Sequence, residues 1–314
     1  MSSVRYFLCA IALLAVTEGQ GAAPGSPLVY DKAEVPAQAA AVEGLVDLGD
    51  VRLRYWDTGG RGDVVVLLHA GTGNALGWAY QQPELARAGY RVIAYSRRGH
   101  AGSEPGPAGS RTAAAADLLK LLDALKVGRF HAVGVAAGGI YATDFALSHP
   151  DRVQSLTIAG SIVAVADVAY MKRSGALRPP AFNELPSEFR ELGPHYRAGH
   201  PEGVAQWLAM ERANTIDPAA LAAARPGLEN KLTLEALKTL RMPVLLLTGD
   251  ADLYTPPALL DELRQAFPHS RAEVIDGAGH AAHWEQPRAF NALLLDFLAT
   301  TRRPRLLHDA GTAR

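Results

Sequence analysis

The sequence alternates short apolar runs with stretches of helical periodicity, and this alternation restricts the fold more than any other feature. Helical spacing is present from Ala113 to Leu125 and from Arg288 to Leu298. The apolar runs that predict strands are Val64 to Leu68, Val92 to Tyr95, Ala132 to Val135, Leu156 to Ile158, Val244 to Thr248 and Ala272 to Ile275. Strands that alternate with helices form a mostly parallel sheet covered by helices on both faces. We therefore predict an α/β fold whose chemistry lies at the carboxyl ends of the strands.

Two segments depart from this alternation. Residues 44 to 56 alternate apolar and polar side chains around Gly49 and Asp50, which predicts a β-hairpin. Residues 162 to 240 have mostly helical periodicity, are interrupted by prolines and contain no convincing strand. An insertion between two strands of a parallel sheet is expected to form a helical lid over the strand ends.

Several aromatic residues are candidates for contact with a substrate. Trp78 precedes the second parallel strand, and Tyr196 and Trp207 belong to the predicted lid. We predict that these three side chains bind substrate together with Ser161, which follows the strand Leu156 to Ile158. Packing within the core of the lid is the alternative role for the lid aromatics.

The composition excludes several classes of function. The 314 residues include 31 Lys and Arg and 32 Asp and Glu, so the formal net charge is -1 and no polybasic run is available for a phosphate backbone. The single cysteine, Cys9, excludes an internal disulfide and a thiolate metal site. Patterns typical of nucleotide-binding loops are also missing. We expect a small-molecule substrate or ligand, with no nucleic acid partner, no cofactor and no metal.

The ends of the chain are predicted to lie outside the folded domain. Arg5 precedes an apolar run and a group of small residues, which is typical of a secretory signal peptide over residues 1–23. The alternative is a buried N-terminal helix, which no amphipathic period supports. Residues 24–43 are then a linker, 44–299 the domain and 300–314 a polar tail. We expect export to the periplasm or secretion and no stable membrane anchor; the oligomeric state stays open.

Five strand–loop junctions contain the residues on which a functional interpretation depends. His69 to Gly73 follow the first parallel strand, Arg98 to Ser103 the second, and Gly134 to Gly139 span the end of the third. Asp252 and His280 follow the last two strands. In order and spacing these junctions resemble the α/β-hydrolase family, of the lid-bearing esterase and lactonase kind, over nearly all of the predicted domain.

The resemblance implies a role for each junction. Asp252 corresponds to the acid and His280 to the base of a catalytic triad, while Arg98 to Ser103 corresponds to a structural turn. The nucleophile of the family stands at the centre of a Gly-x-Ser-x-Gly turn, and that position is Ala136 here. A methyl group cannot attack a carbonyl carbon, so an acyl-enzyme at this position is excluded.

The rest of the implied machinery is present. By similarity, the backbone N–H groups of Gly71 and Ala137 form an oxyanion hole, and His69 orients the loop that contains Gly71. Gly134 and Gly138 permit the tight turn between strand and helix.

Three explanations for Ala136 stay open at the level of the sequence. The residue is a deliberate replacement of serine, or the protein is a natural non-catalytic relative that binds a ligand, or the enzyme needs no covalent step. In the third case, which we favour, His280 oriented by Asp252 acts as a general base. Hydrolysis of an ester or lactone-like compound, lyase chemistry and cofactor-free oxygenation are all compatible with such a dyad.

Other polar residues near the predicted site have ordinary structural roles as alternatives. Ser161 and Ser96 follow strands on either side of the elbow, but most serines at strand ends cap turns. His100 belongs to the predicted structural turn, and His283 is expected to lie on the surface or behind His280.

Overall fold

The computed structural model describes residues 33–107, 112–214 and 226–301. The predicted signal peptide, residues 24–32 of the predicted linker and residues 302–314 lie outside the described residues. Eight strands form one sheet: β1 (Val42–Asp47), β2 (Arg52–Asp57), β3 (Val64–Leu68), β4 (Arg91–Tyr95), β5 (Phe130–Val135), β6 (Val153–Ala159), β7 (Val244–Gly249) and β8 (Ser270–Ile275).

The strand order is β1-β2-β4-β3-β5-β6-β7-β8. β2 pairs antiparallel with both β1 and β4, and all other neighbours in the sheet are parallel. Strand order reverses at β3, because β4 lies on one side of it and β5 on the other. In an open parallel sheet such a reversal leaves a crevice at the carboxyl ends of the two strands. The predicted oxyanion loop and the predicted elbow both begin there.

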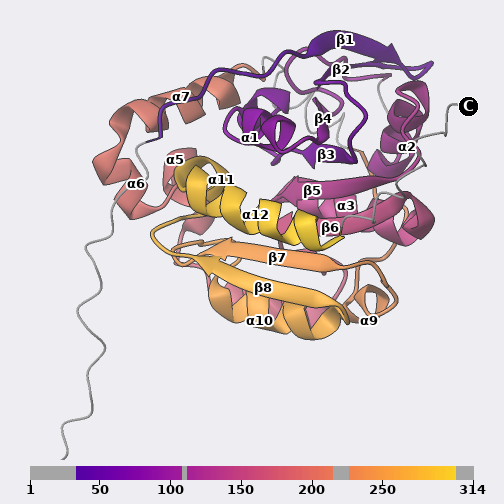
Figure 1. The fold of residues 1–314 in the computed structure, drawn as a ribbon. Coiled ribbons are helices and arrows are strands. Elements are labelled where there is room, and N and C mark those ends of the chain that lie inside the picture. The colour runs from indigo at the N-terminus through magenta and orange to yellow at the C-terminus, as the bar shows by residue number, and fades with distance from the viewer. Residues whose placement is uncertain (1–32, 108–111, 215–225, 302–314) are drawn as a thin grey trace, which may run out of the picture.

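Helices cover the two faces of the sheet (Figure 1). The helices are α1 (Gln82–Arg87), α2 (Ala114–Ala124), α3 (Ala137–Ser148), α4 (Val168–Ala176), α5 (Ser187–Glu191), α6 (Pro194–Gly199), α7 (Pro201–Arg212), α9 (Leu234–Leu237), α10 (Pro257–Ala266), α11 (Ala282–Glu285) and α12 (Pro287–Thr301). Three short 3-10 turns are η1 (Ala75–Trp78), η2 (Pro150–Arg152) and η3 (Phe182–Glu184).

The strands are apolar throughout because both of their faces are buried. In β3, Val66 and Leu68 belong to the core under α2, α3 and α10, whereas Val65 and Leu67 belong to the core under α1 and α12. Side chains alternate between faces along a strand, so a run of five apolar residues supplies both cores at once. This is why continuous apolar runs located the strands in the sequence.

The predicted fold is confirmed, with differences at the domain boundaries. Each predicted apolar run lies within one strand, and residues 44 to 56 lie within the antiparallel pair β1 and β2. However, β1 begins at Val42, before the predicted domain start, and α12 runs to Thr301, past the predicted end. Part of the predicted linker is also packed on the domain, because Gln38 Nε2 donates to the carbonyl of Ala79 at 2.9 Å. A segment rich in proline and alanine, without sustained periodicity, gave no sign of this docking.

The insertion between β6 and β7 is helical in its described part, as predicted. It contains α4 to α7 and α9, together with η3. In Figure 1, α5, α6 and α7 lie beside α11, which follows the loop that contains His280. The backbone N–H of Ala281 donates to the carbonyl of Glu191 at 2.9 Å, so the end of α5 is attached to the His280 loop.

Candidate active site

A cavity of about 220 Å³ lies at the carboxyl ends of the central strands. Its lining combines loops after β3, β5, β6, β7 and β8 with the end of α5. The lining residues are Gly71, Thr72, Ala136, Ala137, Ile140, Gly160, Ile162, Glu191, Tyr254 and His280. Four residues predicted for the site, namely Gly71, Ala136, Ala137 and His280, therefore meet around one cavity.

Ala136 lies in a sharp turn between β5 and α3. Its backbone has φ 50° and ψ -117°, a conformation that L-residues rarely adopt. Two glycines make the turn possible: a Cβ on Gly134 would lie 2.4 Å from the carbonyl oxygen of Gly138, and one on Gly138 would lie 1.9 Å from that of Leu68. The strained turn presents the methyl group of Ala136 to the cavity.

His280 and Asp252 form a buried hydrogen-bonded pair. His280 Nδ1 lies 3.0 Å from both Oδ1 and Oδ2 of Asp252. The carboxylate also accepts the backbone N–H groups of Tyr254 at 2.7 Å and Thr255 at 3.0 Å, and the hydroxyl of Thr248 at 3.2 Å. With Nδ1 directed at a carboxylate, the other ring nitrogen, Nε2, is the one available to the cavity. Nε2 has no hydrogen-bond partner among the described residues.

The charges around this pair set the direction of both pKa shifts. Burial acts to lower the pKa of His280, but the charge of Asp252, its hydrogen bond, and the carboxyls of Glu191 and Glu285 together raise it above 6.5. For Asp252, burial acts to raise the pKa, while His280 and two backbone N–H donors lower it overall. The carboxylate therefore stays ionised and holds the Nδ1–H tautomer of the imidazole.

Two further residues confine the imidazole, and the sequence analysis did not identify them. Tyr254 places its ring 4.3 Å from the His280 ring, centroid to centroid. Gly160 directly follows β6 with φ +53°, and a Cβ there would lie 3.1 Å from both Asp252 Oδ2 and His280 Nδ1. Tyr254 follows Asp252 by two positions, which was a usable signal. Nothing in the local sequence connects Gly160 with the dyad.

Two backbone N–H groups border the cavity on the side of β3 and β5. The N–H of Ala137 is at the first position of α3, where helical N–H groups have no intrahelical acceptor. Neither this N–H nor that of Gly71 has an acceptor within the described part of the chain. The carbonyl of Gly71 lies 3.0 Å from His100 Nε2, and His69 Nδ1 lies 2.7 Å from the carbonyl of Ala70. Both histidines thus hold the loop that contains Gly71.

Residues 98 to 103, which the resemblance assigned to a structural turn, are held by buried ion pairs and by glycines with positive φ. Arg98 is buried and its guanidinium pairs with Asp117 at 2.6 Å and with Asp50 at 2.8 Å. Gly99 and Gly102 have positive φ angles of 74° and 80°. The turn contacts the site through His100, next to Gly71, and through the N–H of Ala101, which donates to Asn214 Oδ1 while Asn214 Nδ2 donates to the carbonyl of Thr72.

The two serines considered as alternative oxygens have other partners. The hydroxyl of Ser161 donates to the carbonyl of Ala136 at 2.6 Å, and Ser96 Oγ accepts the N–H of Ala75 at 3.2 Å. Ser161 lies between two residues that line the cavity, Gly160 and Ile162, but does not line it itself. The structure therefore places Ser161 behind the elbow rather than among the substrate-contacting residues.

The predicted substrate-binding aromatics do not line this cavity either. Trp78, Tyr196 and Trp207 are at most 3% exposed and pack in the core. The Trp78 and Trp207 rings lie 5.1 Å and 5.9 Å from the ring of His283. His283 is itself buried, which corrects the surface alternative, and burial lowers its pKa to about 3. Trp207 from the helical insertion and Trp78 from η1 therefore both pack against α11.

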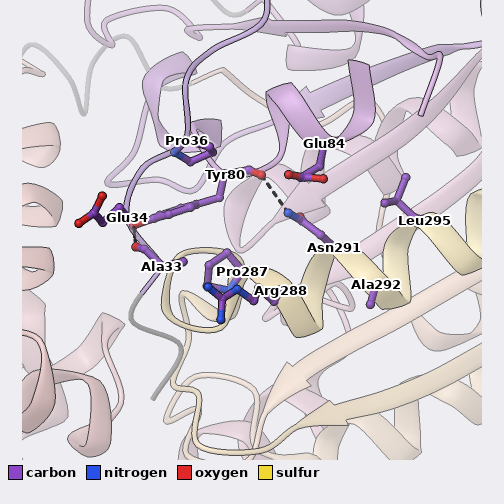
Figure 2. A pocket seen from close by; sticks show the side chains of 10 residues that line it. All are labelled: Ala33, Glu34, Pro36, Tyr80, Glu84, Pro287, Arg288, Asn291, Ala292 and Leu295. Atoms are coloured by element: carbon purple, nitrogen blue, oxygen red, sulfur yellow. Dashed lines mark hydrogen bonds between the residues drawn. The ribbon is translucent and has the colours of Figure 1, made fainter. Parts of the chain in front are cut away.

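A second cavity, of about 730 Å³, lies between the segment before β1 and helix α12 (Figure 2). Tyr80, Asn291 and Arg288 are among its lining residues, and Asn291 Nδ2 donates to the carbonyl of Tyr80 at 2.9 Å. Neither member of the dyad lines it. Although this cavity is larger, it lacks a base next to unpaired N–H donors, so we assign the site to the smaller one.

Within the described residues, no group of three or more His, Cys, Asp or Glu is arranged to hold a metal ion. Within the same ranges, every helix is too short or too polar to cross a membrane.

Comparison with known proteins identifies the family. The family model for the alpha/beta hydrolase fold matches residues 63–287. The chain belongs to the α/β hydrolase family. The match spans every junction of the site from the loop after β3 to His280, in the order that the family requires.

Individual relatives of this α/β hydrolase agree. A 2-hydroxy-6-oxononadienedioate/2-hydroxy-6-oxononatrienedioate hydrolase of Paraburkholderia phymatum is 32% identical over 276 residues, covering 79% of this chain and 91% of the relative. Among solved structures, an enzyme that degrades N-acyl homoserine lactones matches with TM-score 0.67 at 26% identity, covering 81% of this chain and all of that one. The enol-lactonase of Burkholderia xenovorans LB400 shares the fold with TM-score 0.65 at 23% identity, over 82% and 100% of the two chains. The protein is thus a hydrolase-like enzyme of this family.

Proposed function

We propose that this α/β hydrolase cleaves a small ester or lactone-like carbonyl compound by general-base catalysis, without a serine nucleophile. One observation carries the proposal: the Nε2 side of the His280–Asp252 pair and two unpaired backbone N–H groups face one cavity, while the elbow position between them is Ala136. The chain retains the base and the oxyanion donors and lacks only the nucleophilic side-chain oxygen.

The proposed reaction uses water in place of the serine oxygen. His280 Nε2 accepts a proton from water as the water oxygen attacks the carbonyl carbon. The N–H groups of Gly71 and Ala137 donate to the resulting oxyanion. When the tetrahedral intermediate collapses, the bond to the leaving oxygen breaks and that oxygen receives the proton from His280. The products are a carboxylic acid and an alcohol, or one hydroxy acid from a lactone.

Two considerations support an ester or lactone as substrate. The relatives described above are a hydrolase and an enzyme that degrades lactones, and both act on carbonyl compounds. The cavity volume of about 220 Å³ equals about seven water molecules of liquid volume, so it suits a small acyl group. Ile140 and Ile162 make part of its wall apolar.

The dyad can be tested directly. Purified protein is assayed on activated esters and lactones alongside His280→Ala and the control His269→Ala, a histidine that is exposed. General-base catalysis contributes about 100- to 10,000-fold, so we expect a loss of this size for His280→Ala only. Equal rates for all three proteins would remove the dyad from the mechanism.

The missing oxygen favours a second candidate function, a ligand-binding protein without turnover or an inactivated serine esterase. Ala136→Ser distinguishes these cases, because the elbow already has the backbone conformation of a nucleophile position. Strong esterase activity and covalent labelling by a fluorophosphonate in the variant would indicate an inactivated serine enzyme. An unlabelled variant would show that the site was not built for serine.

Two predictions from the sequence complete the proposal. We propose that the helices between β6 and β7 act as a lid over the cavity, because the end of α5 supplies one of its lining residues, Glu191. We also propose that residues 1–23 direct export. Fractionation of cells that express the full chain, with and without residues 1–23, tests the second point.

A further inference from the structure

Glu191 is a buried carboxyl for which the mechanism above has no use. It is the last residue of α5, it is only 4% exposed, and it lines the same cavity as His280. In the described ranges its carboxyl makes no hydrogen bond or salt bridge, and its oxygens are not among the unpartnered side-chain atoms fully closed off from solvent, so they are accessible from the cavity. A largely buried carboxyl without a protein partner is costly, because burial removes most of its hydration.

The backbone around Glu191 is held firmly against the His280 loop. The N–H of Ala281 donates to the Glu191 carbonyl at 2.9 Å. Two residues further on, a Cβ on Gly193 would lie 2.8 Å from the backbone nitrogen of Gly279, so these two backbone segments are in direct contact. Glu285 Oε2 joins them by accepting both N–H groups, at 2.7 Å from Gly193 and 2.9 Å from Gly279. These contacts fix the start of the Glu191 side chain relative to the imidazole.

The charges near Glu191 leave its negative charge incompletely balanced. Burial raises the pKa of its carboxyl, His280 and Arg190 act to lower it, and Glu211 and Asp252 act to raise it. Arg190 donates to the hydroxyl of Tyr254 at 3.3 Å and does not line the cavity. His280 is already paired with Asp252. Among the described residues, no Lys or Arg side chain lines the cavity.

We propose that Glu191 is a specificity-determining residue that binds an ammonium group of the substrate and disfavours carboxylate-bearing substrates. A buried carboxylate facing a small cavity without a cationic wall is stabilised most by a cationic N–H donor on the ligand, because charge-assisted hydrogen bonds are stronger than those from water or a hydroxyl. A second carboxylate placed beside it would be repelled in the same low-dielectric space. The substrate class is then a small amino-substituted ester or lactone, which deepens the function proposed above and rests on it.

The geometry favours recognition over a second role as base. His280 has its proton-accepting nitrogen directed to the cavity and its tautomer held by Asp252. Glu191 lacks any such orienting hydrogen bond to its carboxyl. A ligand ammonium supplies the missing donors, with up to three N–H groups for the two carboxylate oxygens.

Binding of unreactive probes tests the proposal without any need for turnover. Benzylammonium, benzyl alcohol and benzoate have similar shapes and differ in charge; their dissociation constants are measured by NMR titration at neutral pH. The proteins are the wild type, Glu191→Gln and the control Glu188→Gln, which removes a half-buried carboxyl from the same helix. The glutamine is nearly isosteric, so the cavity keeps its shape.

The expected result is an order of preference that depends on one side chain. Wild type binds benzylammonium at least about ten-fold more tightly than benzyl alcohol, and benzoate most weakly, because hydrogen bonds to charged groups are worth more than neutral ones. Glu191→Gln loses about ten-fold or more of this advantage, and Glu188→Gln retains it.

Three outcomes would overturn the proposal. These are equal binding of the three probes to wild type, tightest binding of benzoate, and an ammonium preference that survives in Glu191→Gln. The first two need only the wild-type protein, so they decide the matter even if the variant does not fold. Ammonium preference in a protein that hydrolyses no ester would support the role of Glu191 while refuting the proposed reaction. Ester hydrolysis without ammonium preference would support the reaction and refute the role of Glu191.

Discussion

The strained backbone at Ala136 makes a prediction about stability that is independent of the substrate. At φ 50° and ψ -117° this residue lies outside the regions that L-residues populate. Such conformations cost about 1–3 kcal/mol. Glycine adopts them freely, so Ala136→Gly should remove that cost.

Two opposing effects reduce the gain. Glycine widens the unfolded ensemble, which costs about 0.4–1 kcal/mol. Ala136 is half-buried, so loss of its methyl forfeits part of the roughly 0.8 kcal/mol of a fully buried methylene-sized group. The expected net effect of Ala136→Gly is a stabilisation of about 1 kcal/mol, or a rise in Tm of about 2–4 °C for a domain of this size.

Thermal and urea unfolding of wild type, Ala136→Gly and a control measure this effect. The control is Ala86→Gly, because Ala86 is also half-buried but lies in α1. There glycine should destabilise by about 1 kcal/mol. Opposite signs for the two substitutions are expected. If Ala136→Gly destabilises the protein as much as Ala86→Gly does, the elbow is not strained in solution and the reasoning fails.

Three further predictions concern the dyad and its surroundings. Gly160→Ala should lower stability by about 2 kcal/mol and reduce hydrolysis at least about ten-fold, because its φ is positive and the new Cβ would lie 2.9 Å from the His280 carbonyl oxygen. The control Gly175→Ala adds a Cβ with no atom nearby and should do neither. A fully active Gly160→Ala would contradict this packing. The pKa of His280 is raised above 6.5 and the base must be neutral, so kcat/KM should increase with pH with a midpoint above 6.5. A midpoint below 6.5 would show that Asp252 does not stabilise the protonated imidazole. Burial raises the pKa of Glu285 from 4.5 to about 7, so ionisation of this carboxyl opposes folding. The wild type should therefore lose stability relative to Glu285→Gln as the pH rises from 4.5 to about 7. A constant difference between their urea midpoints across this range would refute the raised pKa.

Much of the fold and part of the site could be predicted because their signals are local. A run such as Val64 to Leu68 has the length and the apolar character of a strand buried on both faces, wherever the rest of the chain lies. The positions of Asp252 and His280 follow from the strand ends that precede them. Parallel strands bring their carboxyl ends to one edge, so residues far apart in sequence meet without any knowledge of side-chain packing.

The predicted substrate-contacting aromatics do not line the cavity, because their place depends on how the insertion docks. Tyr196 and Trp207 are large aromatic residues of the kind that often line pockets. Only their packing in one cluster with Trp284 of α11 shows that their rings are buried between the insertion and α11. The apolar area of large rings is as useful for attaching one layer to another as for holding a ligand. No periodicity distinguishes these two uses.

The sequence by itself determined the order of the motifs along the chain, the retained acid and base, and the absence of a side-chain oxygen at Ala136, since each depends on residue type near a strand end. The tertiary structure alone decided which side chains face the cavity. Glu191 reaches it because two glycines let the insertion touch the His280 loop, and Gly160 because β6 ends beside the dyad. Contacts of this kind join segments far apart in the chain, and their energies depend on close packing that no local pattern records.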